Sequence, residues 1–129
     1  MKNTLRIFDA NVILRYILKD NDEMFARAAK LIYNGNILIL NEVIAEVVFV
    51  LSGRLYNIER KIIAETIICF LDEIEYQDDV LRKGIETYAY TKLDFVDCIL
   101  CAHHIINNSE ICTFDKELTK QLNRKECFI

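Results

Sequence analysis

Short runs of apolar residues alternate along the chain with longer stretches in which apolar positions recur every three or four residues. The short runs are typical of strands, because they are continuous, contain β-forming residues and are bounded by polar positions. Strands are predicted at residues 5–8, 37–40, 74–76, 111–113 and 127–129.

The longer stretches have the apolar periodicity of amphipathic helices. They lie at residues 12–18, 24–32, 42–52, 57–71, 79–89 and 95–106. Polar residues that favour helix N-caps precede three of them, at Asn21, Asn41 and Asp78. Gly35 and Gly53 stand where two of these helices are expected to end.

Alternation of strands and helices predicts an α/β protein with three layers, α/β/α. We expect a parallel sheet of about four to five strands with helices on both faces. The sequence contains no proline, no low-complexity segment, no internal repeat and no linker. Residues 1–129 are therefore expected to form a single domain.

Composition narrows the possible functions. The chain is 53% hydrophobic and 28% charged, as expected for a globular domain. No apolar run approaches the roughly 18 residues of a membrane span, and the N-terminus lacks a signal-peptide pattern. Five cysteines without framework spacing suit a reducing compartment, so we expect a cytoplasmic protein. A net charge of −4 argues against nucleic-acid binding by bulk charge, although it leaves room for a local basic patch.

Acidic residues stand at the ends of two predicted strands. Asp9 and Asp115 each follow a short apolar run, and parallel strands present their carboxyl ends at one edge of a sheet, where ligands bind. Each residue taken alone is more often a helix N-cap, because an aspartate between a strand and a helix is ordinary turn chemistry.

Further acids stand near the starts of predicted helices. Glu42 and Glu46 are four residues apart and share a helix face. Glu42 suits the helix dipole, whereas Glu46 lies among valines and isoleucines, where an unpaired charge is costly. Asp94 suits an N-cap, which leaves Asp97 in the first turn. We expect acids from these segments to converge, and a cation must then offset their repulsion.

All these candidate ligands are oxygen atoms, which favours Mg²⁺ or Mn²⁺. Such a cation retains bound water and leaves coordination sites for a phosphate oxygen. This chemistry suits hydrolysis of a phosphodiester bond, because the cation activates water and offsets the charge of the transition state.

Four short motifs stand out at residues 9–11 (Asp-Ala-Asn), 43–46 (Val-Ile-Ala-Glu), 94–97 (Asp-Phe-Val-Asp) and 113–115 (Thr-Phe-Asp). In this order and spacing they resemble the PIN domain family, in particular the VapC-type toxin ribonucleases of bacterial type II toxin–antitoxin pairs. The resemblance covers nearly the whole chain and implies a PIN-like fold. It implies a Mg²⁺- or Mn²⁺-dependent endoribonuclease that hydrolyses RNA, with a cognate antitoxin as partner and a homodimer as the usual assembly.

By that resemblance, four acids are both catalytic residues and metal ligands: Asp9, Glu46, Asp97 and Asp115. The supporting residues are Asn11, Thr113 and Asp94. Glu42 and Asp94 remain open as further contributors to the metal site. Residues 40–42 lack the proline or serine often found there, and Cys98 follows the third acid where a small residue is commoner. These departures affect local packing and the choice of target.

Three other interpretations remain. The chain could be a non-catalytic PIN-like module that binds RNA or protein. A phosphoacceptor receiver domain has a similar length, but it needs an acidic pair after its first strand, where this chain has only Asp9. Cys98, Cys101 and the adjacent histidines could suggest zinc, but without a second ligand pair they fit the core of a helix better.

Overall fold

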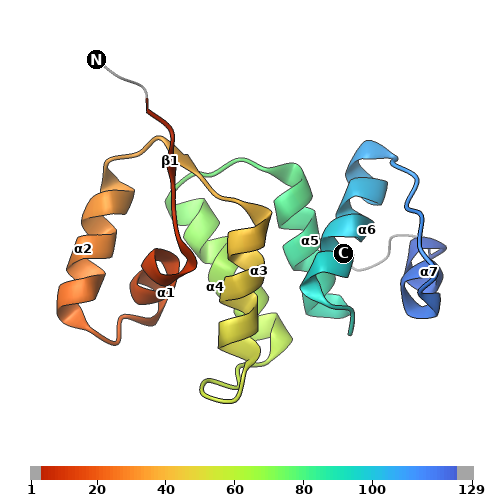
Figure 1. The fold of residues 1–129 in the computed structure, drawn as a ribbon, viewed down its shortest axis with the longest axis horizontal. Coiled ribbons are helices and arrows are strands. Elements are labelled where there is room, and N and C mark those ends of the chain that lie inside the picture. The colour runs from red at the N-terminus through yellow and green to blue at the C-terminus, as the bar shows by residue number, and fades with distance from the viewer. Residues whose placement is uncertain (1–3, 125–129) are drawn as a thin grey trace.

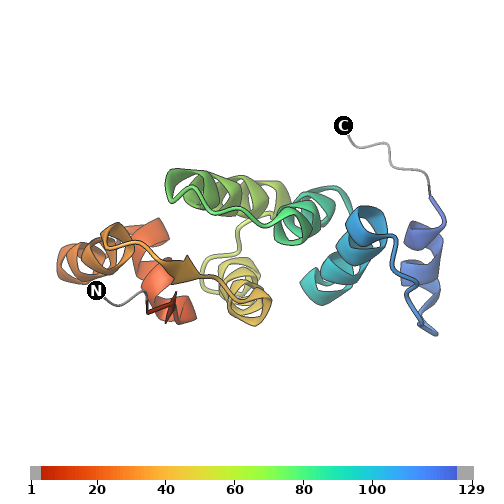
Figure 2. The ribbon, with the colours of Figure 1, turned by 90° about the horizontal axis from the view of Figure 1, so that it is seen from above.

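The computed structural model describes residues 4–124 as seven helices and one small parallel sheet. In chain order the elements are β1 (Arg6–Ile7), α1 (Ala10–Leu18), α2 (Asp22–Tyr33), β2 (Ile37–Leu38), α3 (Asn41–Ser52), α4 (Arg60–Glu73), α5 (Asp79–Tyr90), α6 (Phe95–Asn107) and α7 (Lys116–Leu122). They are spread along the long axis of the molecule, from α2 at one end to α7 at the other (Figure 1 and Figure 2). Among residues 4–124, no helix combines the length and the hydropathy of a membrane span.

Side-chain caps confirm two of the predicted helix starts. The Asn21 side chain accepts a hydrogen bond from the Met24 amide, 3.0 Å away, at the start of α2. Asp78 accepts from the Leu81 amide at the same distance before α5. Asn41 is not a cap, because it is already the first residue of α3.

Most of the core lies between helices. Its largest fully buried residues are aliphatic side chains of α1, α3, α4, α5 and α7, among them Ile13, Ile44, Leu51, Ile63, Ile67, Leu71, Leu81, Ile85 and Leu118. At the contact between α5 and α6, a Cβ atom added to Gly84 would lie 2.5 Å from Cδ1 of Ile99. The missing side chain at Gly84 therefore sets how closely these two helices approach.

The sheet is smaller than predicted. β1 pairs in parallel with β2, with Arg6 opposite Ile37 and Ile7 opposite Leu38, and no third strand joins them within residues 4–124. Two strands cover little surface, so Ile7 keeps 56% of its area exposed while Phe8 is buried. The expectation of about four to five strands is wrong for the described residues, although the α/β class and the parallel pairing are confirmed.

Two of the predicted strands have identifiable reasons for not forming. At residues 74–76 the backbone amides bond back to carbonyls of α4, and Glu75 has a φ of 54°, in the left-handed region. The hydroxyl of Tyr76 instead accepts a hydrogen bond from the Ile39 amide at 3.0 Å. At residues 111–113 no side chain is fully buried, so these residues have no apolar face to pack beneath a sheet. The strand predicted at residues 127–129 lies outside the described residues.

Candidate active site

Asp9 lies between β1 and α1, as the sequence predicts. It is the N-cap residue of α1, and its side chain accepts a hydrogen bond from the Ala10 amide at 2.8 Å. The carboxylate is exposed. Asn11 is also exposed, in the first turn of α1 beside Arg15 and Met24. Asp9 is thus held at a helix start and is open to a ligand.

Glu46 lies on the solvent side of α3 and not among the valines that surround it in sequence. The buried face of α3 is formed by Ile44, Val47, Val48 and Leu51, which follow helical spacing. Glu46 is exposed on another face, as are Glu42 and Phe49. The expectation that Glu46 carries a costly buried charge is therefore wrong.

Three acids gather at the starts of α6 and α7, and we call Asp94, Asp97 and Asp115 the α6–α7 acids. Asp94 is the N-cap residue of α6 and Asp97 is in its first turn. Partial burial raises the pKa of the Asp97 carboxyl, and the negative charges of Asp94 and Asp115 raise it further. These carboxylates are therefore close enough to repel one another.

Thr113 supports Asp115 directly. The Thr113 hydroxyl accepts a hydrogen bond from the Asp115 amide at 3.0 Å, and Oδ1 of Asp115 accepts from the Glu117 amide at 3.2 Å. Asp115 is thus the N-cap residue of α7, a helix that the sequence did not predict. The same carboxylate therefore caps a helix and contributes charge to the α6–α7 acids.

The predicted quartet falls into separate groups. Asp97 and Asp115 interact with each other, whereas Asp9 starts α1, which α3, α5 and α6 separate from α7 (Figure 1 and Figure 2). Within residues 4–124, no three acidic, histidine or cysteine side chains are arranged to hold a metal ion. A four-acid metal site therefore stays a prediction. The donor chemistry of the α6–α7 acids, all carboxylate oxygens, still fits a hard divalent cation.

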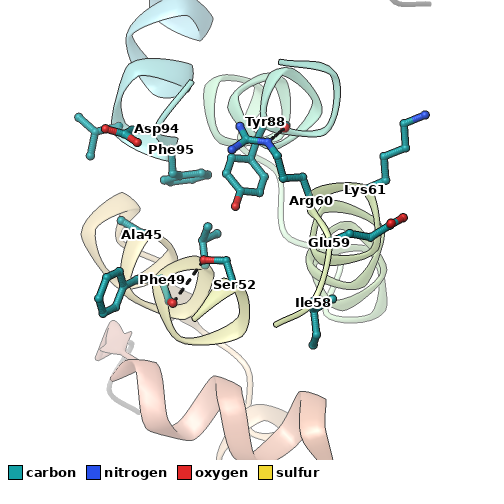
Figure 3. A pocket seen from close by; sticks show the side chains of 12 residues that line it. Ala45, Phe49, Ser52, Ile58, Glu59, Arg60, Lys61, Tyr88, Asp94 and Phe95 are labelled. Atoms are coloured by element: carbon teal, nitrogen blue, oxygen red, sulfur yellow. Dashed lines mark hydrogen bonds between the residues drawn. The ribbon is translucent and has the colours of Figure 1, made fainter. Parts of the chain in front are cut away.

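Arg60 fixes the segment that leads into these acids. Its guanidinium donates from Nε to the Tyr88 carbonyl at 2.8 Å and from Nη2 to the Leu93 carbonyl at 2.5 Å. The group also lies 3.7 Å from the centre of the Tyr88 ring (Figure 3). Arg60 therefore connects α4 with α5 and with the residue before Asp94. Sequence reasoning missed it, although a cation in the first position of a helix opposes the helix dipole and so signals a tertiary role.

A groove of about 1020 Å³ opens beside these residues. Its walls come from α3, the start of α4, the end of α5 and the start of α6 (Figure 3). Aromatic groups (Phe49, Tyr88 and Phe95) line it together with Asp94 and Arg60. The groove is therefore an amphipathic surface next to the first of the α6–α7 acids.

The cysteines of α6 are core residues. Burial raises the pKa of both the Cys98 and the Cys101 thiol to about 11. Both thiols are therefore held in the protonated form more firmly than an exposed cysteine is, which makes them poor nucleophiles. His104 accepts or donates a hydrogen bond at the Ser109 carbonyl, 2.9 Å away, according to its tautomer. Its Nδ1 therefore helps to close the end of α6.

These features define an α/β protein that presents carboxylates at the starts of helices α1, α6 and α7. The sequence matches the PIN domain family over residues 6–122, and the chain therefore belongs to that family. Members are typically metal-dependent nucleases, so membership indicates a nuclease-like function. No curated protein and no solved structure matches the chain significantly.

Proposed function

We propose that the protein is a metal-dependent endoribonuclease that hydrolyses RNA, and that it acts as the toxin of a type II toxin–antitoxin pair. The observation that carries this proposal is the electrostatic crowding of Asp97 by Asp94 and Asp115 in a chain of the PIN family. Carboxylates that repel one another at the starts of two helices suit a site that receives positive charge. Asp9 and Glu46 complete the proposed acidic quartet.

The proposed chemistry assigns different tasks to the acids. When bound, Mg²⁺ or Mn²⁺ supplies positive charge against the phosphate and lowers the pKa of water. Asp115, which is oriented by Thr113, holds one side of that site. Asp97, whose carboxylate interacts with those of Asp94 and Asp115, would hold the other side of that site and orient the attacking water. Cleavage leaves the RNA with one broken phosphodiester bond and one water molecule consumed.

A cleavage assay tests the enzymatic part. Wild type, Asp97→Asn and Glu110→Gln are purified identically and incubated with RNA in Mn²⁺ or in excess chelator. Glu110 is exposed and lies outside the helices, so its variant controls for loss of one charge. We expect cleavage only by wild type and Glu110→Gln, and only with metal. Cleavage that persists equally in chelator, or in Asp97→Asn, contradicts the proposal.

A second candidate is a non-catalytic PIN-like module. The absence of a converged metal-binding group among residues 4–124 favours it. This candidate predicts that the protein binds RNA without cleaving it, and that Asp97→Asn leaves RNA binding unchanged.

The toxin role and its partners are tested separately in cells. We propose a cognate antitoxin and a homodimer as the assembled form. Expression of wild type is expected to stop growth, whereas Asp97→Asn is tolerated. Coexpression of the protein encoded by the neighbouring reading frame should restore growth. Normal growth with wild type alone contradicts the toxin role while leaving the nuclease activity open.

A further inference from the structure

A cavity of about 670 Å³ lies beside the ends of α2 and α4, and we call it the α2–α4 pocket. Its lining comes from Tyr16 and from positions within residues 29–37 and 73–76. Ile37, at the amino end of β2, lines the pocket, whereas Asp9 follows the carboxyl end of β1. Because β1 and β2 are parallel, the pocket and Asp9 lie at opposite edges of the sheet. The volume is that of a site for a small organic ligand.

The α2–α4 pocket is acidic. Glu73 is the last residue of α4, Glu75 follows two positions later, and both are exposed. The described residues that line the pocket include no lysine, arginine or histidine, and neither glutamate forms a salt bridge within residues 4–124. Arg6 donates to the Leu31 and Gly35 carbonyls and so offsets the negative end of the α2 dipole. The charges of the two glutamates therefore remain available to a cationic ligand.

Glu73 is oriented by a neighbouring helix. The Tyr16 hydroxyl, on α1, donates a hydrogen bond to the Glu73 carboxylate. Burial, and after it this hydrogen bond and the charge of Glu73, raise the pKa of Tyr16, so its hydroxyl remains a donor at neutral pH. The Tyr16 ring stacks on Phe25, with the ring centres 5.2 Å apart. Glu73 is thus held in place before a ligand arrives, which limits the entropy lost on binding.

Tyr33 supplies an aromatic face to the α2–α4 pocket. It is the last residue of α2 and is 91% exposed. Within residues 4–124, its ring makes no contact with another ring or with a cation. A free aromatic face attracts ammonium groups. Apolar side chains complete much of the lining, namely Ile32, Ile37 and Ile74.

We propose that the α2–α4 pocket binds a linear aliphatic polyamine. Two ammonium groups pair with Glu73 and Glu75, the methylene chain between them packs on the isoleucines, and Tyr33 covers an ammonium group. A metal ion suits the pocket less well, because no three acidic, histidine or cysteine side chains of residues 4–124 are arranged to hold one. The inference is independent of the proposed ribonuclease function, since it uses none of the acids assigned to cleavage.

The test is calorimetric titration of nucleic-acid-free protein in chelator at low salt. The two probes are spermidine, which presents ammonium groups at two spacings, and n-butylamine, which presents one. Spermidine should bind at least about 5-fold more tightly, because a second ammonium group adds an ion pair with the second glutamate. Equal affinity for the two amines would overturn the proposal.

Variants locate the binding. Glu73→Gln/Glu75→Gln should weaken spermidine binding about 25-fold, about 5-fold for each lost pair. Glutamine at position 73 can still accept from Tyr16, so the fold should be kept. The matched control is Glu23→Gln/Glu110→Gln, which removes the same charge from exposed positions outside the pocket and should bind like wild type. Tyr33→Leu should weaken binding about 2- to 5-fold, whereas Tyr33→Phe, which keeps the ring, should not.

Three results would contradict the proposal. Equal loss of affinity in both double variants would mean that spermidine responds to the overall charge of the chain. Displacement of spermidine by Mg²⁺, but not by NaCl at the same ionic strength, would make the pocket a metal site. Competition by arginine amide as strong as that by spermidine would mean that the pocket recognises a single guanidinium group, such as a partner protein could supply. Absence of RNA cleavage would leave all these binding results unchanged, because no metal or RNA is present.

Discussion

Replacing Asp97 with asparagine is expected to stabilise the protein when divalent cations are absent. The pKa of Asp97 is raised above its ordinary value of 3.8 by partial burial and by the charges of Asp94 and Asp115. The folded state therefore binds a proton at Asp97 more tightly than the unfolded chain does. The free energy of unfolding falls as pH rises from 3.8 through the raised pKa, and at pH 7 the full penalty applies. Asparagine keeps the shape and removes the charge.

The size of the gain follows from opposing contributions. Side chains three positions apart at a helix start are about 6 Å apart, and two unit charges at that distance repel by about 0.7 kcal/mol in water. Asp115 and partial burial add to this penalty. The favourable interaction of Asp97 with the N-terminus of α6, about 0.3–1 kcal/mol, offsets part of it. We therefore expect a net gain of about 0.5–1 kcal/mol at low ionic strength, since solvent screens this partly exposed group.

The assay is thermal unfolding of wild type, Asp97→Asn and the exposed control Glu110→Gln, in chelator, from pH 3.5 to 7. For a chain of 129 residues the gain corresponds to a Tm about 2–4 °C higher at pH 7. The difference should shrink below pH 4, where wild type is protonated. With Mn²⁺ at about a hundred times its Kd, the free energy of unfolding of wild type should rise by about 2.7 kcal/mol, and that of the variant should rise by less. A variant that melts below wild type in chelator at pH 7, with the same difference at low pH, refutes this account of Asp97.

Two further predictions concern packing around the site. Arg60→Met should lower the free energy of unfolding, measured in urea, by about 2 kcal/mol, because it leaves the Tyr88 and Leu93 carbonyls without their donor. The control Lys61→Met, on the same helix, should change the free energy of unfolding by less than about 0.5 kcal/mol. Equal effects of the two variants would mean that Arg60 does not fix the segment. Gly84→Ala should lower the free energy of unfolding by about 1–3 kcal/mol, because the added Cβ clashes with Cδ1 of Ile99. In a double-mutant cycle, Ile99→Val, which lacks that atom, should remove most of this loss. The same cost in both backgrounds would place the strain elsewhere.

Helices were largely predictable from the sequence because their signals are local. Asn21 and Asp78 cap helices through amides only three residues away, so nothing beyond the next turn decides where α2 and α5 begin. Asp9 was correctly predicted between a strand and a helix for the same reason, whereas Asp115 caps α7 without the strand that was predicted before it.

Sheet size and side-chain exposure depend on distant partners and were not predictable. Residues 74–76 have the composition of a strand, but their amides are already bonded to α4, and the Tyr76 hydroxyl bonds to Ile39, the residue after β2. Glu46 has apolar neighbours in sequence, yet helical geometry directs them inward and Glu46 outward. Arg60 acts across 28 and 33 positions of sequence, beyond the range of any local pattern.

Helix α7 has only seven residues, of which one, Leu118, is buried. A helix this short is unstable by itself, so α7 depends on the contact of Leu118 with the rest of the chain. Its backbone amides should therefore exchange with deuterium through local opening, long before those of α4 do. Asp115, Lys120 and Arg124 lie on or beside this helix. Any ligand held by these residues must therefore also stabilise the folded, hydrogen-bonded form of α7. Slower exchange confined to residues 116–122 would then report binding without any change elsewhere in the molecule.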